Sequence, residues 1–324
     1  MALRPILTVT SACLTLLAAS IATSFAEQWP SRTVHVVVPY GAGGVTDTMA
    51  RMTADRLGKI FHQSFVVENK PGAGGALGVS YAMHSAQDGY TILFVGSTLF
   101  TVLPLNRDVN YVPLKDLVPV SITGTNGMVM VVNKDAPWST LREFLDYVKA
   151  NPGKVTYASG GVATNNHLDT AYLAGIEKLD MVHVPFTGGQ ASLQAVLGKT
   201  VDMHFGNSSD LIEPVKNGLV KAIAVSTLKR MPQLPDVPTV AETIPGYEYV
   251  AWNGYAVTGG VPHEVISRLE QALQTVAKDP EVNKVFLNLG IESVGSTQAQ
   301  ALESLKKDMP IYSQMVDMAG VRKK

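Results

Sequence analysis

Three glycines near the start of the chain are the feature best suited to bind a ligand. They follow Val34–Val38, a short β-branched run that predicts a buried strand. Within Gly41–Gly44 few side chains shield the backbone, so a ligand can approach it closely. Thr46 and Asp47 are predicted to open the following helix, as its cap and its first-turn acid.

The chemistry that this loop favours is the binding of a small anion. A helix start below a glycine loop offers free N–H groups and a partial positive charge. The third glycine of dinucleotide-binding loops is missing, and no lysine follows as in the phosphate-binding loops of nucleotide hydrolases. A carboxylate therefore fits better than a nucleotide. An ordinary tight turn between strand and helix is the alternative interpretation.

The sequence offers no comparable pattern for catalysis or for a metal. The nucleophile elbow of serine hydrolases is absent, and the histidines are scattered without a zinc-binding spacing. Asp47 and Asp202 form an acid–base pair only in principle, since each has a structural role as a helix-start or strand-edge residue. We therefore predict a binding protein rather than an enzyme, with no catalytic residue, no metal and no cofactor.

Residues 1–26 are predicted to be a secretory signal peptide. Arg4 precedes a mostly apolar stretch, and Ser24–Ala26 supplies the small residues that a signal peptidase recognises. A transmembrane anchor and a lipoprotein attached through Cys13 are the alternatives, but the chain has neither a basic stop-transfer flank nor the leucine of a lipobox. We expect export to the periplasm and a mature chain without cysteine, which relies on its core for stability.

The composition limits the partners of the mature chain. The formal net charge is −1 and no basic stripe is present, which argues against nucleic acid and anionic membrane surfaces. No second long apolar run follows the signal peptide, so we expect a soluble protein. The length of 324 residues exceeds the usual size of one domain.

The same order of strand, loop and helix occurs twice along the chain, which predicts an α/β fold with two lobes. We assign residues 27–127 and 251–324 to lobe 1 and residues 128–250 to lobe 2. The chain then crosses between the lobes near residues 128 and 250, which suits a hinge of two strands. Ligands of open α/β sheets bind beyond the carboxyl ends of the strands, so a cleft between the lobes is the predicted site. Five aromatic residues are candidates for its walls: Tyr40, Phe100, Phe186, Phe205 and Trp252.

Five motifs, read together, resemble one family over essentially the whole mature chain. They are Val38–Asp47, Val67–Gly75, Asp88–Thr91, Val182–Phe186 and Leu234–Glu242. The family is that of the periplasmic solute receptors of tripartite tricarboxylate transporters, also called Bug-type receptors. The resemblance implies a type II periplasmic binding protein fold, a hinged pair of lobes of the Venus flytrap kind, and a carboxylate ligand.

The resemblance also implies which residues bind. One carboxylate is expected between a loop of each lobe, held by backbone N–H groups and ordered waters. On lobe 1 these residues are Tyr40, Ala42, Gly43, Gly44, Thr46 and Asp47. On lobe 2 they are Ser159, Gly160, Ala163, Thr164, Asn165 and His167. Ser97, Phe186 and Asn207, at the ends of neighbouring strands, complete the predicted site.

The lobe 2 loop departs from the family pattern. Ala163 replaces a frequent glycine and Asn165 a frequent serine, while Thr187 and Gly206 stand where a lysine and an aspartate are frequent. We expect a more open and less charged pocket, suited to a ligand with one carboxylate, aromatic acids included, rather than to citrate.

The prediction is a periplasmic receptor that delivers a small carboxylate to the permease subunits in the membrane and acts as a monomer. A ligand sensor that feeds a two-component sensor kinase is the alternative from another class. An enzyme in the same cleft is the third.

Overall fold

The computed structural model describes residues 28–324, so the predicted signal peptide and Cys13 lie outside the described residues. The first part of the chain alternates strands and helices: β1 (Val34–Val38), α1 (Val45–Phe61), β2 (Phe65–Asn69), the 3-10 turn η1 (Ala73–Gly75), α2 (Ala76–Met83) and β3 (Thr91–Gly96). β1 lies between β2 and β3 and runs parallel to both. The parallel sheet predicted from this alternation is confirmed.

The next segment contains a long strand that the sequence did not reveal. After two short helices, α3 (Thr98–Thr101) and α4 (Leu103–Asn106), β4 extends over Leu117–Asn133. The sequence predicts a strand only at Met128–Val132, a short apolar run within the second half of β4. The register of β4 shifts between Pro119 and Ser121, a bulge of the kind where a strand tolerates proline.

The second set of alternating elements follows the predicted order. It comprises α5 (Leu141–Ala150), β5 (Thr156–Ser159), α6 (Asn165–Glu177), β6 (Val182–Pro185), α7 (Gly189–Leu197), β7 (Met203–Asn207), α8 (Ser208–Lys216) and β8 (Val220–Val225). β5 pairs in parallel with both β6 and β7, while β7 and β8 run antiparallel to β4.

The remaining elements return to the first set. They are the 3-10 turn η2 (Val240–Glu242), β9 (Val250–Thr258), α9 (His263–Val276), α10 (Pro280–Asn288), β10 (Ile291–Ser293) and α11 (Gln298–Met318). All strands join one sheet with the order β2-β1-β3-β9-β4-β7-β5-β6, and β8 and β10 also pair with β4. Among residues 28–324, none of the helices has the length and apolar character needed to cross a bilayer.

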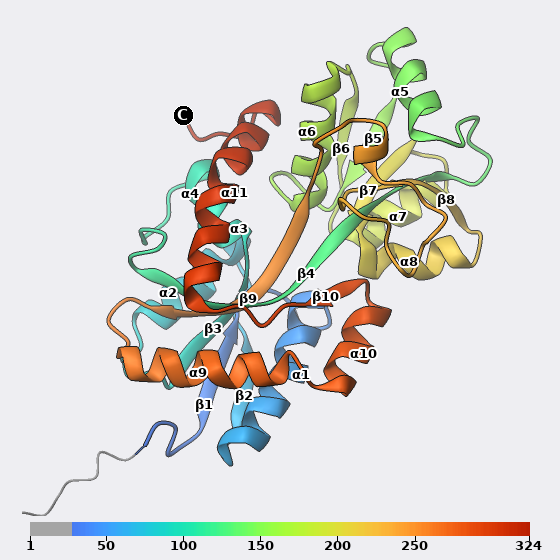
Figure 1. Cartoon of the computed structure of the whole chain (residues 1–324). Coiled ribbons are helices and arrows are strands. Elements are labelled where there is room, and N and C mark those ends of the chain that lie inside the picture. Colours follow the sequence, from blue (N-terminus) through green and yellow to red (C-terminus); the bar gives the residue numbers. More distant parts are fainter. Residues whose placement is uncertain (1–27) are drawn as a thin grey trace, which may run out of the picture.

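Figure 1 shows two groups of elements that β4 and β9 connect. β1–β3, α1, α2, α9 and α10 form one group, and β5–β8 with α5–α8 form the other. These groups resemble the predicted lobes, and the exact lobe boundaries stay a prediction.

Helix α11 packs on both groups, whereas the sequence predicted that it covers lobe 1 alone. In its first half, Ala301 and Leu305 belong to a core cluster with β3 and α3. In its second half, Tyr312, Met315 and Val316 belong to the core that contains α5 and β7. Pro310 lies between the two halves. The helix is therefore a third link between the groups, beside α6 as seen in Figure 1.

Candidate functional site

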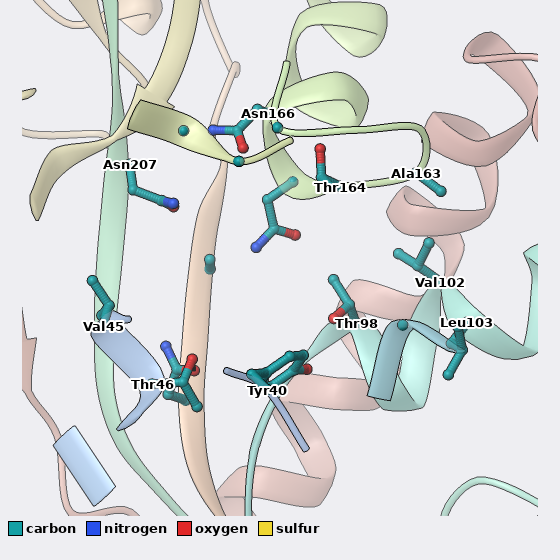
Figure 2. A pocket seen from close by; sticks show the side chains of 18 of the residues that line it. Tyr40, Val45, Thr46, Thr98, Val102, Leu103, Ala163, Thr164, Asn166 and Asn207 are labelled. Carbon is teal, nitrogen blue, oxygen red and sulfur yellow. Dashed lines mark hydrogen bonds between the residues drawn. The ribbon is translucent and has the colours of Figure 1, made fainter. Parts of the chain in front are cut away.

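A cavity of about 390 Å³ lies where the loops of the two groups face each other. Tyr40, Thr46 and Thr98 line it from the first group, and Thr164 and Asn207 from the second (Figure 2). Each of these residues lies within two residues of the end of a strand or the start of a helix. The cavity is thus at the carboxyl ends of the strands, where the alternating pattern predicted a site.

Four helices begin at this cavity. Thr46 lies in the first turn of α1, and Thr164, Gly188 and Asn207 are the N-cap residues of α6, α7 and α8. None of these four helix starts has a side-chain capping bond. Their first N–H groups are therefore available to a ligand, and their helix dipoles add partial positive charge at the same place. This arrangement suits an anion.

The structure divides the predicted site residues into two sets. Seven line the cavity: Tyr40, Thr46, Gly160, Ala163, Thr164, Asn165 and Asn207. Eight lie outside its lining: Ala42, Gly43, Gly44, Asp47, Ser97, Ser159, His167 and Phe186. Of the five candidate wall aromatics, Tyr40 and Trp252 line it, whereas Phe100, Phe186 and Phe205 pack in or against the core.

Asp47 lies beneath the first glycine loop and holds it. The residue is 3% exposed, and its carboxylate accepts hydrogen bonds from Gly43 N (2.9 Å), Arg51 Nε (3.0 Å) and Asn69 Nδ2 (2.9 Å). Burial alone raises the pKa of this carboxyl, but the bonds from Arg51, Gly43 and Asn69 outweigh burial and keep the pKa below its ordinary value. Asp47 therefore fixes the loop through its charge.

Thr46 does not cap α1, contrary to the sequence prediction. Gly44 is the N-cap residue and has an extended conformation. A Cβ added to Gly44 would have only Gly41 O within 4 Å, at 3.9 Å. Thr46 Oγ1 instead donates to Asn253 Oδ1 at 2.9 Å. Since Asn253 is on β9 and also lines the cavity, this bond joins the start of α1 to a strand that connects the two groups.

His167 and Ser159 support the second loop from below. Ala163, with φ of 63°, donates its N–H to His167 Nδ1 at 3.2 Å. The His167 ring stacks on His183 with 3.8 Å between centroids, and His183 Nε2 lies 2.7 Å from Ser159 Oγ. Burial, followed by the nearby His183, lowers the pKa of His167 to about 4. A neutral imidazole that accepts at Nδ1 therefore stabilises the left-handed backbone at Ala163.

Ser97 and Phe186 have packing roles. Ser97 is buried at the end of β3, and its Oγ lies 3.1 Å from the hydroxyl of Tyr312 on α11. Phe186 follows β6 and packs against the core cluster that includes Val129 and Leu193. Neither residue lines the cavity.

The predicted set missed several residues that line the cavity. Asn126 and Asn253 come from β4 and β9, and Gly188 and Gly189 open α7. The double glycine was a visible signal for a helix start. Arg107, which follows α4, also lines the cavity and has no recognisable motif around it.

The described residues contain no group of three or more His, Cys, Asp or Glu side chains that could hold a metal ion. Ser159 and His183 approach each other like a nucleophile and a base. However, Ser159 is fully buried, and its hydroxyl also donates to Gly161 O at 3.0 Å. The serine therefore does not present its oxygen to the cavity, and an acyl-transfer site is not assembled.

Two α/β groups around a cavity where four helices begin have the architecture of a periplasmic solute-binding protein, and the comparisons agree. Residues 49–316 match the family described as "Tripartite tricarboxylate transporter family receptor" (TctC). The chain belongs to this family, whose members are binding receptors.

Similar proteins support this membership. A UPF0065 protein from the gbd 5' region of Cupriavidus necator is 32% identical over 303 residues, covering 92% of each chain. The protein BugT of Bordetella pertussis is 30% identical over 304 residues, covering 92% of this chain and 93% of BugT.

Three solved structures have the same fold. R. palustris Rpa4515 with adipate has a TM-score of 0.82 at 26% identity, covering 91% of this chain and 99% of that one. Periplasmic binding protein BugD has a TM-score of 0.79 at 31% identity, covering 91% of this chain and 100% of BugD. MatC from Rhodopseudomonas palustris with bound malate has a TM-score of 0.78 at 28% identity, covering 89% of this chain and 100% of MatC. The predicted fold class and family are confirmed.

Proposed function

We propose that this protein is a periplasmic receptor that binds a small carboxylate and delivers it to the membrane permease of a tripartite transporter. The observation that carries the proposal is the convergence of four uncapped helix starts on one cavity. A carboxylate accepts several N–H bonds at once, and the helix dipoles compensate its charge. The related proteins with adipate and malate support the same ligand class.

Binding is coupled to closure of the lobes. The ligand contacts the loop before α1 and the loop before α6, which belong to different groups of elements. Both loops reach the ligand only when the groups are close together, so the ligand stabilises the closed state by a shift in population. β4 and β9 are the proposed hinge strands. The permease then recognises the closed receptor.

The first experiment is a thermal-shift screen of residues 27–324 against mono-, di-, tri- and aromatic carboxylates. A ligand at 100 times its Kd that binds only the folded state adds about 2.7 kcal/mol to the free energy of unfolding. Because ligand retained from expression masks such a shift, mass spectrometry of the denatured sample accompanies the screen. A sample free of small molecules that responds to no carboxylate would contradict the proposal.

A pair of variants tests the anion loop directly. Gly44 has no atom closer than 3.9 Å to the position of an added Cβ, so a side chain fits there. Gly44→Asp places a negative charge at the start of α1, and we expect at least about a tenfold loss of affinity for a carboxylate. Gly44→Asn has the same size and can cap the same N–H groups without the charge, so its affinity should lie between those of the wild type and Gly44→Asp. Affinities of both variants equal to that of the wild type would exclude an anion at this loop.

Export and delivery need separate tests. We expect the full chain to be processed after Ala26 and recovered from the periplasm, which the mass of the mature protein checks. For delivery, uptake of the identified carboxylate into cells should depend on both the receptor and its permease.

A further inference from the structure

Among the described residues 28–324, Arg107 is the only charged one that lines the cavity. It follows α4 with extended backbone (φ −150°, ψ 166°), and its side chain is exposed at the cavity. Its Cζ lies 3.9 Å from the position of an added Cβ on Gly74, which also lines the cavity. The guanidinium therefore passes over the backbone of η1, where glycine leaves room for it.

The charge of Arg107 is not compensated by the described part of the protein. Its hydrogen bonds go to Asn106 Oδ1, with long distances of 3.3 and 3.4 Å from Nη2 and Nε. Asp108, the next residue, pairs with Lys323 instead, at 3.1 Å. A guanidinium offers five N–H donors in a planar fork, so most of its donors remain available to a ligand.

The C-terminal end of the chain fixes the turn that carries Arg107. Asn106 Nδ2 donates to Val321 O at 2.6 Å, and Lys323 N donates to Leu105 O at 2.9 Å. The ion pair of Lys323 with Asp108 adds a third contact. The turn is thus held at both of its ends, which keeps the base of the Arg107 side chain in one place.

An apolar wall lies next to Arg107. Figure 2 shows Val102, Leu103 and Ala163 together on one side of the cavity, away from Thr46 and Asn207. Leu103 Cδ1 lies 3.0 Å from the added Cβ position of Gly74, so Leu103 and Arg107 flank the same glycine. The cavity therefore has a polar end formed by helix starts and an apolar side that leads to a cation.

We propose that Arg107 binds a second acidic group of the ligand, so that the receptor prefers acyclic dicarboxylates over monocarboxylates of the same chain length. This inference rests on the proposed carboxylate function. One carboxylate is at the helix starts, methylene groups contact Val102 and Leu103, and the distal carboxylate pairs with the guanidinium in a fork-to-fork arrangement. The expectation of a less charged pocket, drawn from the lobe 2 loop, did not include Arg107, which lines the cavity.

The test compares ligands that differ only in the distal group. Calorimetry on residues 27–324 measures the affinities for α,ω-diacids of four to eight carbons and for the linear monoacids of equal length. For the tightest diacid we expect at least about tenfold higher affinity than for its monoacid, since hydrogen bonds to a charged group are among the stronger ones. Arg107→Gln should reduce this ratio to about one while it leaves the monoacid affinity within about twofold.

The matched control is Arg142→Gln, which removes the same charge from an exposed arginine on α5, outside the cavity lining. It should retain the wild-type ratio. A wild-type ratio near one, or a ratio that Arg107→Gln leaves unchanged, overturns the role of Arg107 while the carboxylate function stands. If the ligand-free wild type binds no acid of either series or of the wider screen, the carboxylate function falls as well.

Discussion

The replacement Asp47→Asn tests whether the carboxylate beneath the glycine loop is structural. The change preserves the size of the side chain of a residue that is 3% exposed. It removes the negative charge and turns one acceptor oxygen into an N–H₂ donor. We expect both the free energy of unfolding and the affinity for the ligand to fall.

The magnitude follows from the partners of Asp47. If the new amide retains its oxygen toward Gly43 and Arg51, its N–H₂ group faces the Nδ2 donor of Asn69. The side-chain amide of Asn69 cannot rotate to offer its oxygen instead. Rotation would break the bond that its Nδ2 donates to Tyr40 O and the bond that its Oδ1 accepts from Arg51 Nη2. One buried donor is therefore left without an acceptor, which costs about 1–3 kcal/mol. The lost ion pair with the half-exposed Arg51 adds less than about 1 kcal/mol.

Urea unfolding of the wild type and the variant at pH 7 measures the difference, for which these two contributions together give about 1–4 kcal/mol. Asp55→Asn is the matched control, because Asp55 is an exposed acid of the same helix that pairs with Arg56 and Lys59. Its change should cost less than about 1 kcal/mol. Asp47→Asn should also weaken carboxylate binding, whereas Asp55→Asn should not.

The pH dependence gives a second check on Asp47. Because its pKa in the folded state is below the ordinary value of 3.8, its contribution to stability is complete above that value and is lost as the pH falls through the folded pKa. The difference between wild type and Asp47→Asn should therefore be constant from about pH 5 to pH 8 and shrink below about pH 4. A difference under about 0.5 kcal/mol at pH 7, a surface-like value, would refute the reasoning.

Three further predictions concern other parts of the site. Burial lowers the pKa of His167 to about 4, so the unfolded chain binds a proton at a higher pH than the folded protein does. Stability should therefore fall as the pH drops from about 6.5 toward 4. In thermal melts, the melting temperature of His167→Gln should depend less steeply on pH over this range. Tyr312→Phe removes the hydroxyl beside buried Ser97 and should cost about 1 kcal/mol in urea unfolding, and an unchanged midpoint would contradict this. Removal of residues 321–324 releases the turn of Arg107, so calorimetry should show a larger loss of affinity for diacids than for monoacids.

Local patterns predicted the parts of the fold that depend on neighbours in sequence. The strand β1, the glycine loop and α1 follow one another within thirty residues, and each has a composition typical of its structure. β4 was missed in its first half, because its stability comes from β9, more than a hundred residues further along the chain. A proline in such a strand is acceptable only where the pairing is bulged, which the sequence alone does not reveal.

The site was predictable where backbone groups form it and less so where side chains do. The start of α1 after the glycine loop follows from the sequence pattern, although Gly44 rather than Thr46 is its N-cap residue. Asp47 and His167 belong to the right loops, but the structure places them below the loops, as supports. Arg107 reaches the cavity through the packing of a short irregular segment, for which periodicity gives no signal.

The shared strand β4 and the split packing of α11 make the two groups one folding unit. A fragment that ends at residue 127 would lose β9 and α11 and leave the edges of β3 and β4 unpaired. A fragment of residues 128–250 would lose Tyr312, Met315 and Val316 from its core. Neither half closes its own core, so we expect the protein to unfold in a single cooperative transition. β4, one of the two strands proposed as the hinge, is thus also a strand that keeps the two groups from folding separately.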